Sequence, residues 1–474
     1  MNQPQEVVMS TIKPLAMFCA VLLLAGCAGF SRDGGFAAVQ HDAESRLNKQ
    51  LLWARDQEDR SLIELRVAEL LANPLSAEAA VQLALLNNRG LQASFDELGI
   101  GEADRVQADR LPNPGFSFGR LEKGSEVEYE RGLQLNLARW IALPMISRQE
   151  GRRFEQLQRQ ISLAVFELAS ETLKAWYQAV AAEEGVIYAR QVLEAAEAGA
   201  ELARRMAVVG NFSRLQQAEQ QSFYAEVGIS LIQAEQIRMR SREQLARLLG
   251  LWGGQLDYQL PERLPALPDN AEELLDVERL ALSQRQDILS ARLDAERLAQ
   301  NLGAIRTLGF INVLELGVVN NRSNEAPTLR GYEVGVELPL FDWGGANKAR
   351  AEAQYRQALN RAAEIAVNAR SQVREAYKNY RNTFELARHY RAEVLPLSRR
   401  IAAEKMLRYN GMFISTFDLI ADARRQVQAV SSYLQAQLDF WQARVELDRA
   451  LSGIPRISHD SALADVAELT TADS

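Results

Sequence analysis

The sequence is poor in the side chains that usually bind metals or form disulfides. It has only two cysteines, three histidines and eight methionines in 474 residues. His41, His389 and His459 are far apart, no histidine and cysteine cluster of zinc-site spacing occurs, and the methionines form no dense tract. We therefore expect no metal site and no cofactor.

The sequence also lacks a basic surplus and familiar catalytic motifs. Its formal net charge is −8 and its pI is about 5.4, which argues against nucleic acid as a partner. Neither the Gly-x-x-x-x-Gly-Lys-Ser/Thr motif of P-loop ATPases nor the Gly-x-Ser-x-Gly motif of hydrolases occurs. We expect a protein that is not an enzyme.

The apolar run near the N-terminus is too short to span a membrane. Lys13 precedes the wholly apolar segment Leu15–Ala25, and a membrane helix needs about 20 such residues whereas an export signal needs about 7–15. We interpret residues 1–26 as a signal peptide, with Met1 or Met9 as the true start. With Cys19 removed, Cys27 is the one cysteine left, so the mature chain can form no internal disulfide.

The end of this signal, Leu24-Ala25-Gly26-Cys27, resembles the lipobox of bacterial lipoproteins. That resemblance implies a diacylglycerol on the sulfur of Cys27, further acylation such as palmitate, and cleavage before Cys27. Ala28, rather than Asp, follows the cysteine, which by the sorting rule of that family implies the outer membrane. The alternative is a chance cysteine at the end of an ordinary signal peptide.

The chain contains an internal duplication. Tyr129–Leu137 reappears as Tyr332–Leu340, an offset of roughly 200 residues that indicates a duplicated domain rather than a solenoid. A chain of this length exceeds one compact core of ordinary shape. We predict an N-terminal extension over 27–76, a first repeat over 77–260, a proline-rich linker over 261–268, a second repeat over 269–453 and a tail over 454–474.

Each repeat begins with a helical stretch, which is followed by two segments that are typical of strands. They are predicted at 115–121, 128–137, 310–319 and 332–340, where apolar and polar residues alternate. The pattern fits two soluble hairpins as well as it fits membrane strands with one face in lipid. In a membrane, four strands of one chain cannot close a barrel and open edges are not tolerated, whereas four strands from each of three chains could close one.

Two long helical hairpins are predicted at 145–252 and 346–452. In each, apolar residues recur with 4,3 spacing over many turns, which indicates a coiled-coil seam, and its many alanines indicate close-packed helices. Residues 149–209 alone would extend roughly 90 Å at 1.5 Å per residue. Pro396 lies inside the second long helix and is expected to bend it.

The lipobox, the duplication, the paired strands before each long helix and the alanine-rich seams together resemble the TolC-like outer-membrane efflux family over residues 77–453. The resemblance implies a mainly α fold with a membrane β portion, in which a trimeric 12-stranded β-barrel with four strands per chain continues into a long α-helical barrel. It implies a homotrimer in contact with outer-membrane lipid, with a large periplasmic part. It further implies a passive duct that docks onto a periplasmic adaptor (membrane fusion) protein and, through it, an inner-membrane pump of a tripartite efflux or secretion system.

By the same resemblance, the turns between the long helices form the periplasmic tip. Glycine and asparagine there are expected simply to end helices, and the family adds contact with the adaptor. The residues concerned are Val209, Gly210, Asn211, Phe212 and Ser213 in the first turn, and Gly411, Met412, Phe413, Ile414 and Ser415 in the second.

A possible entrance gate follows the second turn. Family members often carry two aspartates three residues apart, of which Asp418 matches the first, nine residues after Tyr409, whereas Asp422 lies one residue late for the second. In a trimer Asp418 would form a ring of carboxylates that favours cations. Alternatively, Asp418 is an N-terminal helix acid that interacts with the helix dipole.

Two rival hypotheses remain. A lipid-anchored periplasmic coiled-coil scaffold without a channel predicts no heat-modifiable membrane trimer and no conductance. A lipoprotein enzyme or binding module needs a convergent polar pocket that the sequence does not indicate. The cargo, whether drug, metal ion, solvent or polypeptide, and the class of pump are not fixed by the sequence.

Overall fold

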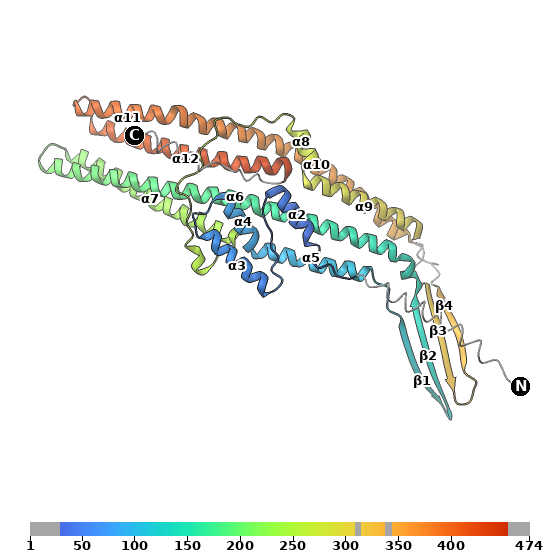
Figure 1. The fold of residues 1–474 in the computed structure, drawn as a ribbon. Helices are drawn as coiled ribbons and strands as arrows, with labels where there is room; N and C mark the ends of the chain where they lie inside the picture. Colours follow the sequence, from blue (N-terminus) through green and yellow to red (C-terminus); the bar gives the residue numbers. More distant parts are fainter. Residues whose placement is uncertain (1–28, 309–313, 337–343, 454–474) are drawn as a thin grey trace. The chain divides into compact units, whose positions relative to one another are not determined.

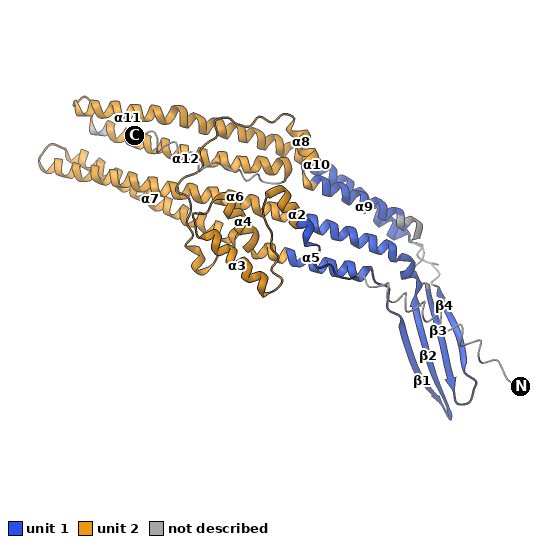
Figure 2. Cartoon of the chain, in the orientation of Figure 1, with its two compact units in different colours: residues 1–39, 95–160, 288–365 blue, residues 40–94, 161–287, 366–474 orange. Residues whose placement is uncertain are grey.

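The computed structural model describes residues 29–308, 314–336 and 344–453 (Figure 1). The chain divides into two compact units, each assembled from segments of both repeats (Figure 2). Unit 1 comprises Met1–Val39, Phe95–Gln160 and Ile288–Ile365, and unit 2 comprises Gln40–Ser94, Ile161–Asp287 and Ala366–Ser474.

Unit 1 contains an antiparallel four-stranded sheet of order β1-β2-β3-β4. The strands are β1 (Gly115–Lys123), β2 (Glu126–Asn136), β3 (Leu314–Ser323) and β4 (Leu329–Val336). β2 of the first repeat pairs with β3 of the second, so one sheet joins the two repeats. Within the described residues β1 and β4 are edge strands.

The strand ends differ in detail from the alternation in the sequence. β3 extends to Ser323 rather than Val319, because Asn320 and Asn321 pair with Arg330 and Leu329 across the ladder. The predicted strand residues 310–313 and 337–340 lie outside the described residues.

Helices account for most of the remaining described chain. The helices of the first repeat and its N-terminal extension are α2 (Phe36–Leu47), α3 (Gln57–Leu71), α4 (Ala77–Asn87), α5 (Arg89–Ala108), α6 (Leu137–Val208), α7 (Arg214–Leu249) and the short 3-10 helix η1 (Gly253–Leu256). Those of the second are α8 (Val277–Gln284), α9 (Gln286–Leu308), α10 (Gly345–His389), the π-turn η2 (Tyr390–Val394), α11 (Leu395–Asn410) and α12 (Thr416–Ser452). None of the described helices combines the length and the apolar character that crossing a membrane requires.

The fold is therefore the expected mainly α architecture with a small antiparallel β portion. Most of the α6 seam is buried, including Val165, Ala179 and Val186. Thr172, the one polar member of that seam, is also fully buried. The 4,3 spacing thus predicted which face of α6 packs against the rest of unit 2.

Aromatic side chains form the core of unit 2 and connect the two repeats. Tyr177 of α6 stacks on Trp441 of α12, with ring centroids 5.3 Å apart. The ring of Phe440 in α12 packs against the rings of Tyr380 and Phe384 in α10, with centroid distances of 5.5 and 5.7 Å. Such rings bury much apolar surface and favour defined geometry, so they fix the two hairpins to one another.

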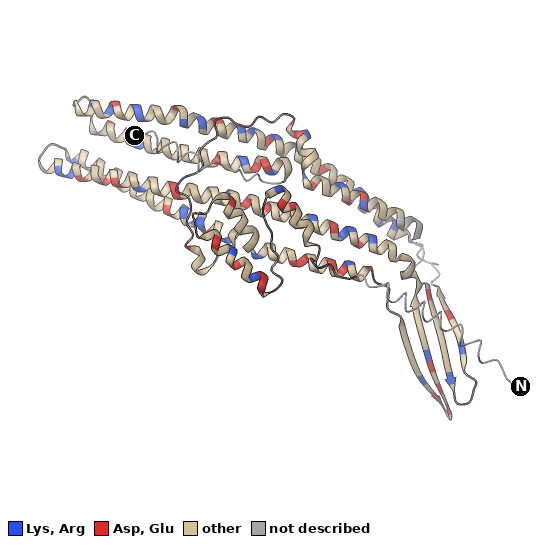
Figure 3. Ribbon diagram, in the orientation of Figure 1, with Lys and Arg blue, Asp and Glu red and all other residues tan. Residues whose placement is uncertain are grey.

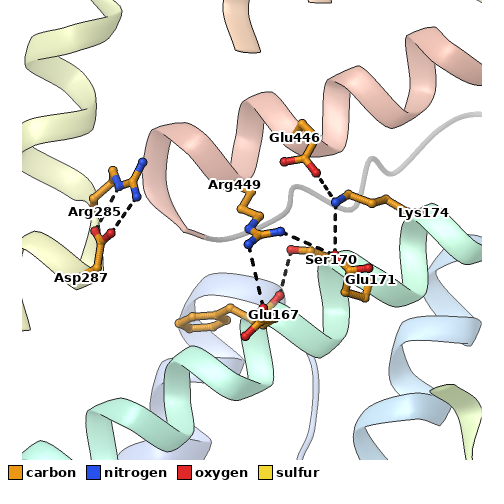
Figure 4. Close-up of polar contacts among 9 residues, drawn as sticks. Glu167, Ser170, Glu171, Lys174, Arg285, Asp287, Glu446 and Arg449 are labelled. Carbon is orange, nitrogen blue, oxygen red and sulfur yellow. Dashed lines mark hydrogen bonds and ion pairs between the residues drawn. The ribbon is translucent and has the colours of Figure 1, made fainter. Parts of the chain in front are cut away.

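Ion pairs between α6 and α12 add to this connection (Figure 4). Lys174 contacts both Glu171 and Glu446, and Arg449 lies 3.5 Å from Glu171. These side chains are partly solvated, so each pair contributes little to stability, on the order of 1 kcal/mol or less.

The proline-rich segment 261–268 packs against the helices of unit 2. Leu264 and Leu267 are buried, and the carbonyl of Pro265 accepts hydrogen bonds from Gln437 Nε2 at 2.8 Å and Trp441 Nε1 at 3.1 Å. The amide of Leu264 donates to Glu184 at 3.0 Å. This connection between the repeats is thus part of the core.

Candidate functional site

The two faces of the sheet differ sharply in chemistry. Residues paired across antiparallel strands share a face, and neighbours along a strand lie on opposite faces. The register therefore places one row of apolar residues across all four strands. That row is Phe116, Leu133, Val318 and Tyr332, and beside it lie Leu135, Leu316 and Val334.

This apolar face is exposed in the single chain. Phe116, Leu133, Val318, Tyr332 and Val334 are all exposed. Large contiguous apolar surface on a single chain is a sign of an interaction with a partner or a membrane. The strand alternation left a soluble sheet and a membrane sheet equally open, and the absence of a covering core over these described side chains favours the membrane.

The opposite face of the same sheet is polar and acidic. Small residues such as Gly132 and Gly317 alternate there with carboxylates and amides. The acidic members are Glu126, Glu128, Glu130, Glu315 and Glu333, with Lys123 as the basic one among the described strand residues. One face suited to lipid and one suited to water is the pattern of a membrane strand.

The first helix turn, between α6 and α7, is closed by a left-handed glycine. Gly210 has φ +80°, and the amides of Asn211 and Phe212 donate to the carbonyl of Met206 at 2.9 and 3.2 Å. Ser213 caps α7 in a reciprocal capping box with Gln216. The expected helix-ending role of the turn is therefore met, and the turn leaves Val209 exposed.

The second turn, between α11 and α12, is built differently. Its left-handed position is Met412, with φ +63°, while Gly411 has an ordinary φ of −83°. Met412 is 93% exposed and Phe413 is 83% exposed. Ile414 and Ser415 complete the turn, and Ser415 begins the capping box of α12.

The two hairpins contact one another near these turns. Ala196, Phe223, Val227 and Ile420 form a small buried cluster, and Arg424 of α12 pairs with Glu226 of α7 at 2.9 Å. The turns of both repeats are therefore brought together at one end of unit 2. The surface they present includes exposed Val208 and Leu407, which our sequence analysis did not select.

Asp418 serves as the capping partner of Ser415. The Ser415 amide and hydroxyl donate to Asp418 Oδ2 at 3.1 and 2.7 Å, and the Asp418 amide donates to Ser415 Oγ at 3.2 Å. These hydrogen bonds to the charged form lower the pKa of Asp418 below its ordinary value. Asp418 is exposed and ionised, so the capping role is present in the single chain and leaves a ring in a trimer open.

Asp422 has a different environment. It is 7% exposed, and its Oδ1 lies 3.2 Å from Lys405 Nζ and 3.3 Å from a terminal nitrogen of Arg425. Tyr409 is half-buried, and its carbonyl accepts from the Met412 amide at 2.9 Å. In the single chain, Asp422 thus ties α11 to α12, while Tyr409 supports the turn.

Two further expectations from the sequence concern the lipidated cysteine and metal binding. Cys27 lies outside the described residues. Shortly after it, Ser31 donates to Glu102 of α5 from both its amide and its hydroxyl, at 2.7 and 2.5 Å. No group of three or more metal-ligating side chains occurs in the part of the chain that the structure describes.

Comparison with known proteins gives a consistent set of relatives. The cobalt-zinc-cadmium resistance protein CzcC of Cupriavidus metallidurans is 24% identical over 80% of this chain and 90% of its own length. The transmembrane channel protein CusC is similar in structure, with a TM-score of 0.67 and 16% identity over 79% of this chain and 92% of CusC. The Neisseria gonorrhoeae outer-membrane channel MtrE gives a TM-score of 0.62 with 20% identity over 81% and 91% of the two chains. No family model matches the sequence.

Proposed function

Because the chain has the fold of the TolC-like outer-membrane channels, we propose that it is a lipid-anchored outer-membrane duct of a tripartite efflux or secretion system. Three copies would each contribute four strands to one barrel in the membrane and two hairpins to an α-helical barrel in the periplasm. The duct would be passive, with energy supplied by an inner-membrane pump.

The observation that carries this proposal is the sheet with one apolar and one acidic face. Its apolar residues have no cover within the described chain, and β1 and β4 leave unpaired edges. Lipid would cover the apolar face, and β1 of one copy pairing with β4 of the next would satisfy the edge amides. The acidic face would then line water.

The docking surface for the adaptor is proposed at the helix turns, from Val209 to Ser213 and from Gly411 to Ser415. The exposed Met412 and Phe413 side chains support this. A carboxylate ring at Asp418 is part of the same proposal. The paired and buried state of Asp422 favours a structural role for that residue.

Conductance in planar bilayers tests the duct. The purified full-length protein, in detergent, should insert as a trimer and give discrete conductance steps. Absence of both a membrane trimer and conductance would favour the scaffold hypothesis, and a stable trimer without conductance would end the proposal of a duct.

Site-specific photo-crosslinking tests the docking surface. A photoreactive residue in place of Phe413 should form an adduct that mass spectrometry identifies as a periplasmic adaptor protein, whereas the same residue at exposed Ile232 of α7 should not. Equal yields of the adaptor adduct at the two positions would show that the turns are not the contact.

A further inference from the structure

Four arginines gather on the apolar face of the sheet, at the end where its hairpins turn. Arg131 pairs with Phe118 on one side and Asn320 on the other, and Asn320 pairs with Arg330. In the next row, Tyr129 lies between Arg120 and Arg322. We call these four side chains, Arg120, Arg131, Arg322 and Arg330, the arginine rows.

Few carboxylates of the described chain lie near the guanidinium groups of the arginine rows. All four side chains are exposed, and Arg120 contacts Glu122, the one acidic residue on this face of the described strands. Among the residues that the structure describes, no carboxylate lies within ion-pair distance of Arg131, Arg322 or Arg330. The other glutamates of the described strands occupy the opposite face, although both signs follow the same strands (Figure 3).

The rows directly adjoin the apolar part of the face. Arg131 lies two residues from Leu133, and Arg330 two residues from Tyr332, which corresponds to about 7 Å along a strand. Burying a guanidinium in the hydrocarbon costs several kcal/mol, but the border between hydrocarbon and headgroups tolerates it. Tyr129 and Tyr332 are also at this border, where tyrosine is enriched in membrane proteins.

We propose that the arginine rows bind the phosphate groups of anionic lipids in the leaflet next to the β-turns. The inference rests on the proposed membrane location of the sheet. Guanidinium groups bind phosphate oxygens in a bidentate manner and are less strongly hydrated than ammonium groups. Four of them over a lipid-facing surface would recruit headgroups of complementary charge and hold the barrel at a fixed depth.

The test compares lipid retention by the full-length protein in vesicles of phosphatidylcholine with and without phosphatidylglycerol. After detergent extraction, native mass spectrometry counts the lipids that remain on each trimer. The wild type should retain phosphatidylglycerol in preference to phosphatidylcholine. The variant R120Q/R131Q/R322Q/R330Q should lose this preference by at least about tenfold, since each basic side chain at a lipid surface contributes a factor of roughly five.

A matched control changes charge on the other face of the same strands. The variant E128Q/E130Q/E333Q should keep the preference, because its glutamates face away from the lipid. Replacing the four arginines by lysine should retain part of it. Inorganic phosphate added as a competitor should leave retention unchanged, and displacement by it would indicate a site for free phosphate instead.

Failure of the inference can be told from failure of the proposed function. A nitroxide on Val318→Cys should show high oxygen accessibility and low accessibility to a polar relaxant if the sheet lies in lipid; the reverse would overturn the membrane location itself. If the nitroxide reports lipid but the wild type shows no preference for phosphatidylglycerol, the proposal of a headgroup site is wrong. The wild-type measurement decides this even if the quadruple variant fails to assemble.

Discussion

At the scale of single residues, Met412 shows where local strain and exposure coincide. A left-handed backbone at a residue with a side chain costs free energy, on the order of 1 kcal/mol. Met412 adopts the left-handed conformation although it is 93% exposed. Packing of its side chain within the chain therefore contributes little free energy to offset the strain. Backbone strain together with an exposed apolar side chain favours a contact between Met412 and a partner protein.

We predict that Met412→Gly raises the free energy of unfolding by about 0.5–1 kcal/mol, because glycine adopts a positive φ without strain. The same variant should lower the yield of adaptor crosslinked from position 413. Thermal unfolding in detergent measures the first effect.

Gly210→Ala in the other turn is the matched control. Gly210 also has a positive φ, and no atom lies within 4 Å of an added Cβ, so only backbone strain changes. It should lower stability by about 1 kcal/mol. If Met412→Gly also lowered stability, the strain argument would be wrong.

The two aspartates after this turn are predicted to differ in their effect on stability. Asp422→Asn removes the carboxylate that lies between Lys405 and Arg425 and should cost about 1–3 kcal/mol, less than a fully buried pair because Lys405 and Arg425 are partly solvated. Asp418→Asn, at an exposed cap, should lower stability much less. Urea unfolding of the two variants checks this, and equal small losses would return Asp422 to the list of gate candidates.

At the scale of elements, periodicity predicted most of what the structure shows. The 4,3 spacing identified the long helices and the buried face of α6, and the period-2 alternation identified the strands. Both signals are local, so a single segment carries them. The arginine rows could not be found this way, because their grouping depends on the pairing of β1 with β2 and of β2 with β3.

The proline in the second long helix is another feature that the sequence predicts only in part. Pro396 was expected to bend the helix, and the structure places a π-turn at Tyr390–Val394, directly before it, with the Leu395 amide donating to the carbonyl of Tyr390. A π-turn is a common local adjustment where the regular ladder is interrupted. Proline predicts an interruption of the helix, but the sequence pattern does not indicate that it takes the form of a π-turn.

Neighbouring residues of β2 lie on opposite faces of the sheet, so the same substitution at two adjacent positions tests the membrane placement. Leu133→Lys places a charge on the apolar face, in the same row as Tyr332. It should destabilise the membrane-inserted trimer by about 1–2 kcal/mol, which lies between the costs at the interface and at mid-depth. Gln134→Lys places the charge on the acidic face, beside Gly115 and Gly317 of the paired strands, and should have little effect. Trimer yield after membrane extraction distinguishes them, and equal yields would contradict the membrane placement of this face.

Glu184 of α6 makes the stability of the linker contact depend on pH. Burial raises the pKa of Glu184 above its ordinary value, while the hydrogen bond from the Leu264 amide partly opposes this. A raised pKa in the folded state means that the folded protein binds more protons, so stability is lost as pH rises from the unfolded pKa of about 4.5 through the folded value.

Glu184→Gln should therefore raise the melting temperature at neutral pH, because the amide oxygen can still accept from Leu264 without a buried charge. The gain should vanish at a pH below the ordinary pKa of glutamate, where Glu184 is protonated in both states. Melting curves across this window test the prediction. A gain that persisted in acid would mean that the effect has another cause.

At the scale of the whole molecule, several apolar surfaces of the described residues are uncovered in the single chain. The apolar seam on α10 and α11 is buried at Ala369 and Val373, but its members Leu359, Leu397 and Ile401 are exposed. Sequence periodicity predicts that such a stripe packs, but it does not say against which chain. Further copies of the chain would cover these residues, as they would complete the edges of the sheet.

The acidic face of the sheet gives the assembled duct a predicted selectivity. From the described strands alone, three copies would place fifteen glutamates, five from each chain, and three lysines around one aqueous lumen. Carboxylates along a water-filled pore attract cations and repel anions, and the effect weakens as salt screens it over a Debye length of about 10 Å at 0.1 M. The open channel should therefore pass cations in preference to anions, most strongly at low ionic strength.

Reversal potentials in a salt gradient measure this preference directly. E128Q/E130Q/E333Q removes three of the five carboxylates that the described strands of each chain place on this face. It should reduce the ratio of cation to anion permeability several-fold, with Glu126 and Glu315 left in place. R120Q/R131Q/R322Q/R330Q, on the lipid-facing side of the same strands, should leave the ratio unchanged. If the arginine variant shifted the reversal potential and the glutamate variant did not, the two faces would have to be exchanged, with the apolar row in the lumen and the glutamates outside.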